Sequence, residues 1–227
     1  MNGVNMKKII SIIIISLFFT ISLYAQGSIS IFAGYGQSSF QEDLFGDDSK
    51  IEQAGYVPVG IQAGYNLSNM TFGTIFLGAE FNYAVIPFTF ELNDDIGNGQ
   101  QKLADFKINQ MVIGALVKVK FGKGNFNPFI RLGGGAYLGG ADLEYTDELK
   151  ALYQQQLNQT LEDEELDIKT AFGFNAGAGA DFKMGTSTSF FVEFVYHMVS
   201  REPDEEDAES IDANNWAAHV GIQFGLN

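Results

Sequence analysis

Residues 188–200 have the sequence TSFFVEFVYHMVS, and the alternation within this stretch decides the fold. From residue 190 to residue 198, every second position carries a large apolar side chain: Phe190, Val192, Phe194, Tyr196 and Met198. The positions between them include Glu193 and His197 beside apolar residues. Successive side chains of a β-strand point to opposite faces, so this period of two predicts a strand with one purely apolar face.

The same alternation occurs in seven further segments of the chain. We predict strands at 28–37, 55–66, 73–86, 106–121, 128–139, 168–182 and 214–226, in addition to 188–200. In residues 172–182, for example, one register holds only Phe and Ala, and the other holds Gly with Asn175 and Asp181. Segments of about ten residues or more have the length of a tilted transmembrane strand.

The gaps between these segments alternate in length. The short gaps are 67–72, 122–127 and 183–187, and the long gaps are 38–54, 87–105, 140–167 and 201–213. A soluble up-and-down barrel has no reason to place all its long loops at one end. A barrel of the bacterial outer membrane does, because short turns face the periplasm and longer loops face outward.

The charges agree with this interpretation. The chain carries a formal net charge of −15, and every acidic residue except Glu80, Asp181 and Glu193 lies in a predicted long loop. We predict a charge network in the lumen of the barrel, formed by Glu80, Lys118, Lys120, Arg131, Asp181 and Glu193. Polar companions in the same register are Gln62, Tyr137, Asn175 and Gln223. Eight strands leave an interior that side chains just fill, so this network predicts a plug.

The opposite arrangement, a soluble lipocalin-like barrel with the apolar face inside, would scatter many Lys and Glu along its outer face. The predicted strand interiors hold too few charges for that. A charge facing lipid near the midplane costs about 2–4 kcal/mol, which favours the apolar face outside. Aromatic residues also form two predicted belts: Tyr35, Tyr83 and Tyr196 toward the loops, and Tyr65, Phe121, Phe182, Phe190 and Phe224 toward the turns.

Composition excludes several classes of protein. With 46% hydrophobic and 18% charged residues, the chain is too apolar for a disordered protein and too polar for a helical membrane bundle. It contains no cysteine, which excludes disulfides, cysteine-ligated metals and a cysteine nucleophile. Its acidity makes nucleic acid a poor partner.

The amino-terminal segment has the features of a signal peptide. Lys7 and Lys8 precede an apolar core over 9–23, and cleavage after Ala25 is predicted. We therefore expect a signal peptide at residues 1–25 and a barrel domain at residues 26–227, with Met1 or Met6 as the start. An uncleaved membrane anchor is the alternative.

The third long gap carries a helix signal. Thr146 can cap the helix, and acids follow in the first turn. An apolar stripe at helical spacing consists of Leu149, Leu152, Tyr153, Leu157 and Leu161. Such a helix either folds over the barrel mouth or its rim, or offers a contact surface to a partner protein.

Candidate chemical sites are sparse. His197 and His219 face the predicted lumen, where with Glu193 they would bind a metal or sense pH, or serve only the interior. The acidic runs 162–165 and 204–207 lack the spacing of an EF-hand loop, so they are solvated loops or weak sites for Ca²⁺ or Mg²⁺. The chain has no Gly-x-Ser-x-Gly motif. We predict no catalytic residue and no cofactor or resident metal.

Three segments carry a resemblance to a known family: NPFIRLGGGAY at 127–137, FVEFVY at 191–196 and VGIQF at 220–224. The chain resembles the small outer-membrane β-barrel proteins of the OmpA-barrel, OmpX and opacity-protein type. The resemblance implies an eight-stranded meander, both termini in the periplasm, and roles in envelope integrity, adhesion or minor permeability. Many relatives end on an aromatic residue, whereas the last aromatic residue here is Phe224.

Taken together, the prediction is an all-β fold, an eight-stranded antiparallel up-and-down transmembrane β-barrel with a short helix in the third long loop. We expect it in the outer membrane, with a structural and surface-interaction role, acidic extracellular loops and a plugged lumen. A narrow or gated pore and a lipid-modifying barrel enzyme are the alternatives. Expected partners are outer-membrane lipid and glycolipid, divalent cations at the acidic loops and an extracellular protein.

Overall fold

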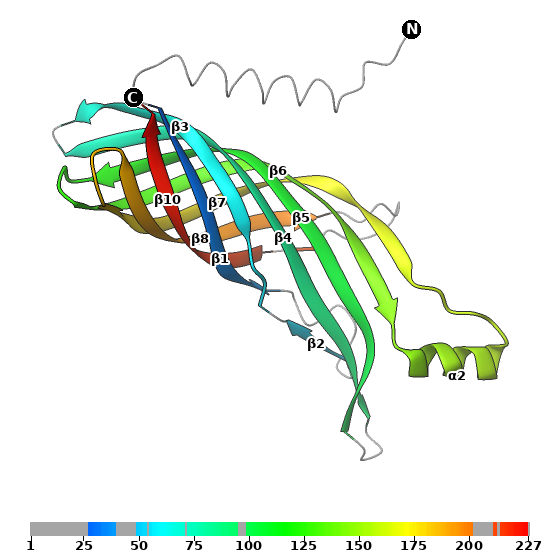
Figure 1. Cartoon of the computed structure of the whole chain (residues 1–227). Coiled ribbons are helices and arrows are strands. Elements are labelled where there is room, and N and C mark those ends of the chain that lie inside the picture. Colours follow the sequence, from blue (N-terminus) through cyan, green and yellow to red (C-terminus); the bar gives the residue numbers. More distant parts are fainter. Residues whose placement is uncertain are drawn as a thin grey trace, which may run out of the picture.

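A computed structural model describes residues 27–39, 49–53, 55–70, 72–94, 99–201, 211–212 and 214–226. Within these residues, eight long strands form the wall of a barrel (Figure 1). They are β1 (Gly27–Ser39), β3 (Val59–Met70), β4 (Gly73–Asp94), β5 (Gly99–Phe121), β6 (Phe126–Tyr145), β7 (Glu164–Lys183), β8 (Thr188–Arg201) and β10 (Asn214–Leu226). The remaining described elements are β2 (Ser49–Gln53), β9 (Ile211–Asp212) and the helix α2 (Asp147–Leu157). The predicted signal peptide at 1–25 lies outside the described residues.

Each long strand pairs antiparallel with its neighbours, and the ring closes between the first and last strands. β1 pairs with β10 from Gly27↔Leu226 to Ser39↔Asn214, and β10 pairs with β8 on its other side. The short strands lie off this ring, because β2 pairs with β4 and β9 pairs with β8. The predicted eight-stranded antiparallel barrel is confirmed.

The two registers point as the alternation predicts. Phe172 and Phe174 on β7 are 80% and 71% exposed, whereas Glu80 and Arg131 are 4% and 1% exposed. Most of the predicted belt residues are exposed as well: Tyr35, Tyr83, Tyr196, Phe121, Phe182 and Phe224. The apolar face therefore lies outside and the polar register lines the bore, the arrangement typical of a barrel surrounded by lipid.

Short turns join the strands at one end, which we call the turn end. Residues 122–125 connect β5 to β6, and residues 184–187 connect β7 to β8. Gly122 has φ +89°, a conformation that favours glycine, and its N–H donates to the carbonyl of Phe72 at 3.0 Å. The opposite end is the loop end. No helix in the described part of the chain is long and apolar enough to cross a membrane.

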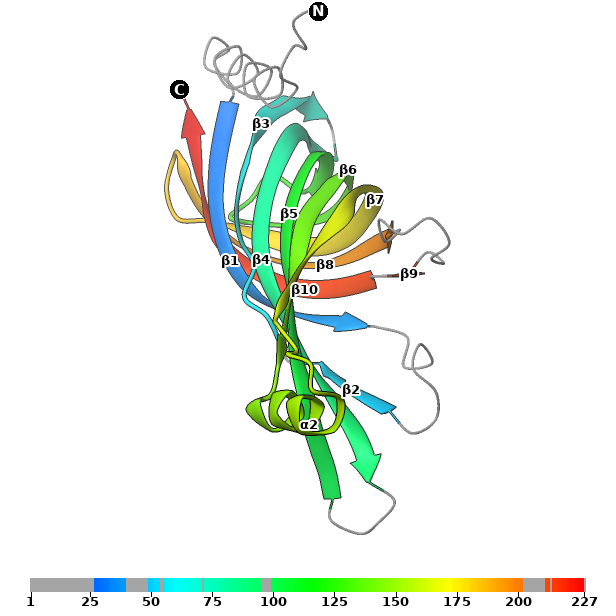
Figure 2. The same ribbon diagram turned by 90° about the vertical axis from the view of Figure 1, so that its right-hand side faces the viewer.

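The strands run farther toward the loop end than the sequence predicts. β4 continues to Asp94 and β5 begins at Gly99, although residues 87–105 were expected to form a loop. β6 and β7 likewise enter the predicted loop 140–167 and leave α2 between them. Several acids assigned to loops, such as Glu91 and Asp142, therefore lie on strands. We call the loop-end parts of these four strands, residues 84–94, 99–109, 139–145 and 164–168, together with β2, the extension; Figures 1 and 2 show it projecting beyond the ring.

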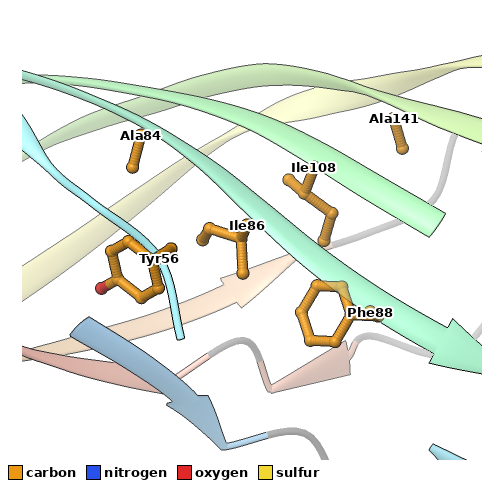
Figure 3. Packing of buried hydrophobic residues seen from close by; sticks show 6 residues of the cluster. All are labelled: Tyr56, Ala84, Ile86, Phe88, Ile108 and Ala141. Carbon is orange, nitrogen blue, oxygen red and sulfur yellow. The ribbon is translucent and has the colours of Figure 1, made fainter. Parts of the chain in front are cut away.

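The extension has an apolar inner face. Six buried residues from three strands and the segment before β3 form a cluster there: Tyr56, Ala84, Ile86, Phe88, Ile108 and Ala141 (Figure 3). Phe90 and Phe106 pack against it. Several of the alternate positions carry charged side chains, among them Lys107, whose Nζ lies 2.8 Å from Glu144 Oε1. In the extension the large apolar side chains thus face inward, whereas in the barrel they mostly face outward.

The predicted helix in the third long loop is present, but it does not fold over the barrel mouth or its rim. α2 begins at Asp147, and the hydroxyl of its N-cap Thr146 accepts from the N–H of Leu149 at 3.4 Å. None of its residues is buried, and Leu152 and Leu157 are exposed. Figure 1 shows it at the far end of β6, away from the ring, so it covers neither the mouth nor the rim.

Candidate functional site

The bore collects the charged residues of the inward register. The structure places all six residues of the predicted network in the bore: Glu80 on β4, Lys118 and Lys120 on β5, Arg131 on β6, Asp181 on β7 and Glu193 on β8. Strand alternation places them there, because each has the opposite parity to the exposed apolar residues of its strand. Three acids and three bases face one another, so the enclosed formal charges balance.

Arg131 joins two carboxylates from different strands. Its Nη1 lies 3.0 Å from Glu80 Oε2 and 2.8 Å from Glu193 Oε1, and its Nη2 donates to Asn175 Oδ1 at 2.9 Å. All three charged side chains are almost completely buried. A buried charge is tolerated when it is paired and hydrogen-bonded, which the planar guanidinium does for both acids at once.

Lys118 completes this cluster from β5. Its Nζ lies 2.8 Å from Glu193 Oε2 and donates to Gln62 Oε1 at 2.7 Å. The amide nitrogen of Gln62 donates to Glu80 Oε2 at 2.7 Å and to Glu193 Oε1 at 3.0 Å. Both carboxylates thereby receive several donors, which fixes the cluster across the width of the bore.

A second ion pair lies nearer the turn end. Lys120 Nζ lies 2.5 Å from Asp181 Oδ2 and donates to Gln223 Oε1 at 3.0 Å. The amide of Gln223 donates onward to Ser28 Oγ at 2.7 Å. Of the predicted polar companions, Gln62, Asn175 and Gln223 therefore contact the network directly.

The two histidines occupy separate places. His197 Nδ1 lies 2.8 Å from the hydroxyl of Tyr137, and His219 Nδ1 lies 3.1 Å from Glu193 Oε1. The register sets Glu193 opposite His219 and His197 opposite Asn215. No group of three or more His, Asp or Glu suited to a metal occurs among the described residues.

Sequence reasoning missed the buried aromatic side chains of the bore. Four buried phenylalanines lie in the inward register: Phe32, Phe76, Phe129 and Phe191. Lys118 Nζ lies 4.7 Å from the ring centroid of Phe129 and 4.8 Å from that of Phe191. Such phenylalanines alternate with exposed apolar residues along their own strands, and this parity was the signal available in the sequence.

Outside the bore, one acid of the run 162–165 supports the third loop. Asp163 Oδ1 lies 2.8 Å from Lys150 Nζ and accepts from the backbone N–H of Tyr145 at 2.9 Å. The Lys150 hydrogen bond, followed by the Tyr145 N–H, lowers the pKa of Asp163. Glu164 and Glu165 belong to β7, and the run 204–207 lies outside the described residues.

Comparison with known proteins gives one family match. The model of the outer membrane protein beta-barrel domain matches residues 12–224. No curated protein matches the chain. Among solved structures, the outer membrane protease OmpT from Escherichia coli is similar in fold, with a TM-score of 0.51, 8% identity, and coverage of 88% of this chain and 96% of that one.

Two further structures have lower scores. Neisserial surface protein A has a TM-score of 0.47 and 14% identity, over 87% of this chain and 96% of that chain. The attachment invasion locus protein Ail of Yersinia pestis, in complex with the heparin analogue sucrose octasulfate, has a TM-score of 0.43 and 15% identity. That match covers 88% of this chain and 99% of Ail.

Proposed function

The chain belongs to the outer membrane protein beta-barrel domain family, and we propose that it serves as a structural, surface-interacting protein of the cell envelope. It is a small transmembrane β-barrel of the outer membrane. We expect the turn end to face the periplasm and the loop end to face the outside of the cell, as in other barrels of the outer membrane. Outer-membrane lipid and glycolipid then contact the exposed apolar band.

The observation that carries this proposal is the filled bore. Charged side chains from five strands cross it and pair with one another, with Arg131 and Glu193 at the centre. Buried phenylalanines occupy it as well. A lumen packed in this way supports a structural role over transport, because solutes need an open path.

The extension supports the surface role. It carries polar and charged side chains on its outer face, including the Lys107–Glu144 pair, and it ends in the exposed helix α2. Exposed extracellular elements of a rigid scaffold are where binding residues concentrate. We propose that this region meets an extracellular protein, and that its carboxylates bind divalent cations weakly beside anionic glycolipid. Titration with Ca²⁺ that gives no heat of binding would contradict the cation part.

Conductance tests the closed bore against its main alternative, a narrow or gated pore. The purified protein, refolded in detergent, is added to a planar lipid bilayer under an applied voltage. Heat-modifiable gel migration first verifies that the barrel is folded. We expect a current no greater than that of the bare bilayer; steady channel events would favour the pore.

A lipid-modifying enzyme is the remaining alternative, and we propose no enzymatic role. In the described part of the bore, His197 contacts the hydroxyl of Tyr137 and His219 contacts the carboxylate of Glu193. Lipid extracts of a deletion strain and its parent are compared by mass spectrometry. A modified lipid acyl chain that is found in the parent strain and is missing from the deletion strain would contradict the proposal.

A further inference from the structure

Two lysines at the turn end differ from the other lysines of the molecule. Lys123 lies in the turn between β5 and β6, Lys183 is the last residue of β7, and both side chains are exposed. Among the lysines whose side chains the structure describes, these two have no hydrogen-bond or ion-pair partner. Carboxylates pair with several of the others: Lys102, Lys107, Lys118, Lys120 and Lys150. The turn end therefore carries two positive charges that no carboxylate in the described part of the chain neutralises.

Hydrogen bonds hold these two lysines on adjacent segments of the rim. The N–H of Lys183 donates to the carbonyl of Asn125, two residues after Lys123, at 2.8 Å. Within the turn, the side-chain amide of Asn127 donates to the carbonyl of Gly124 at 3.0 Å. The turn that carries Lys123 is thereby fixed to the end of β7. The two lysines belong to one small area of the rim.

Large apolar side chains surround this area. Phe126 and Phe182 are 56% and 40% exposed, and their ring centroids lie 5.2 Å apart. Phe121, two residues before Lys123, is exposed as well. Aromatic side chains at the end of a transmembrane barrel lie at the boundary between hydrocarbon and headgroups. A lysine one or two residues nearer the rim can extend its ammonium group to the level of the lipid phosphates.

The surface charge differs between the two ends of the barrel. In residues 117–129 and 181–190 the one acid is Asp181, which is buried and paired with Lys120. At the loop end, by contrast, Glu148, Glu164 and Glu165 are all exposed. An anion near the surface is therefore attracted to the turn end and repelled from the loop end.

We propose that Lys123 and Lys183 bind the headgroup of an anionic phospholipid whose acyl chains lie against the exposed phenylalanines. The ammonium groups donate hydrogen bonds to phosphate oxygens. A zwitterionic lipid is a poorer ligand, because its own cation neutralises its phosphate, whereas phosphatidylglycerol has no such cation. This inference rests on the proposed function, in which the turn end faces the periplasm, and it assigns the site to the phospholipids of that leaflet.

Quenching of tryptophan fluorescence by brominated lipid measures the preference at each end. The single tryptophan of the chain, Trp216, lies near the start of β10 at the loop end. The reporter variant Trp216→Phe/Phe182→Trp moves the tryptophan next to Lys183. Both proteins are refolded into phosphatidylcholine vesicles that contain either brominated phosphatidylglycerol or brominated phosphatidylcholine. We expect a preference for phosphatidylglycerol of about fivefold at the turn-end reporter and none at Trp216.

Lysine substitutions in the reporter variant decide the assignment. Lys123→Gln/Lys183→Gln should make quenching by the two lipids equal. The matched control, Lys102→Gln/Lys107→Gln, removes two exposed lysines from the extension with the same change in net charge, and it should keep the preference. The inference is overturned if the reporter variant shows no preference, or if the preference survives the loss of Lys123 and Lys183. It also fails if both pairs of substitutions abolish the preference equally, because net charge alone then explains it.

A comparison of salts separates a lipid headgroup from free phosphate. Sodium phosphate should weaken the preference no more than sodium chloride of the same ionic strength, because both act by screening. A stronger effect of phosphate would assign the site to the free anion and overturn the assignment to lipid.

Failure of the inference is distinguishable from failure of the proposed function. Heat-modifiable migration verifies that each protein is folded, and Phe121→Trp replaces Phe182→Trp as the reporter if the latter does not fold. A barrel that folds into vesicles without a lipid preference removes the lysine site and leaves the closed structural barrel standing. A parent that conducts in planar bilayers contradicts the closed bore, while the lysine-dependent preference is still decided by quenching.

Discussion

The lipid-facing part of the barrel and the extension beyond it are made from the same strands with opposite polarity. In the barrel, Arg131 lies inside and Phe174 outside. In the extension, Ile86 and Phe88 lie inside, while Lys107 lies on the outer side and pairs with Glu144. The medium explains the difference, because lipid accepts an apolar face and water accepts a polar one.

The change happens within β4 without a break in the strand. Tyr83 and Val85 point outward, Ile86 and Phe88 point inward, and the pairing with β5 continues without a shift up to Phe90. At Val85–Ile86, the large apolar residues move from the outward-facing to the inward-facing positions of the strand, while the pairing itself stays in register. We therefore expect the lipid-facing part of β4 to end near this position. Four substitutions test the comparison, from the largest expected effect to the smallest.

Arg131→Met should have the largest effect. It leaves Glu80 and Glu193 buried without their guanidinium, and breaking a buried pair in this way costs about 3–5 kcal/mol. Urea unfolding of the refolded barrel, followed by gel migration, measures the loss. Lys107→Met is the control in the extension, where the pair with Glu144 is exposed, and it should leave the midpoint unchanged. Equal effects would refute the difference between the two regions.

Ile86→Ala should destabilise the extension alone. Removing a buried isoleucine side chain costs about 2–5 kcal/mol, here from the cluster around Phe88 and Ile108. Hydrogen exchange of the amides over 84–94 should become faster, while exchange in β8 stays unchanged. Val85→Ala, one position away and 39% exposed, serves as the control with little expected effect. Slow exchange in the Ile86 variant would show that the cluster does not hold the extension.

Val192→Arg places a charge on the lipid-facing side of β8. The cost should be about 2–4 kcal/mol if the position lies near the bilayer midplane. Thr89→Arg, at an outward position of the extension beside Asp105, should have a much smaller effect, because an arginine there can pair with that carboxylate outside the lipid. Folding efficiency in lipid vesicles measures both. A harmless Val192→Arg would contradict the membrane orientation of the barrel.

The smallest effect concerns pH and the support of α2. The pKa of Asp163 is lowered in the folded protein, chiefly by Lys150, so its stabilising contribution is full above the unfolded pKa of about 3.9. The contribution is lost as the pH falls through the lower folded value. Exchange of the Tyr145 amide should therefore increase at acid pH in the parent. In Asp163→Asn it should show no such dependence beyond that of intrinsic exchange, and a similar acid response in both would remove this role.

The barrel itself was predictable because its signal repeats. Residues 190–198 and 172–182 alternate throughout, and the structure confirms which face lies outside. The same alternation places Arg131 and Glu193 on the inside, although register alone cannot say that Arg131 also reaches Glu80. That contact depends on how strands far apart in the ring face one another across the bore.

The extension was missed because its apolar register changes phase. In the sequence, the adjacent apolar residues Val85 and Ile86 interrupt the alternation, and Pro87 follows them. Both features indicate the end of a strand when a single alternation is assumed. The strand continues because Pro87 occupies an outward position and the inward residues now pack on each other. The position of α2 was also unpredictable, since it depends on how far β6 continues.

Closure of the ring between β1 and β10 has a consequence for assembly. The pairing Gly27↔Leu226 joins residues almost a full chain length apart, and it runs to Ser39↔Asn214. Contacts of such high sequence separation form late, because the ends must first meet at an entropic cost. Until the final strand is present, β1 has an open edge, a template for pairing with other chains. We therefore expect incompletely folded molecules to associate through this edge until the seam has formed.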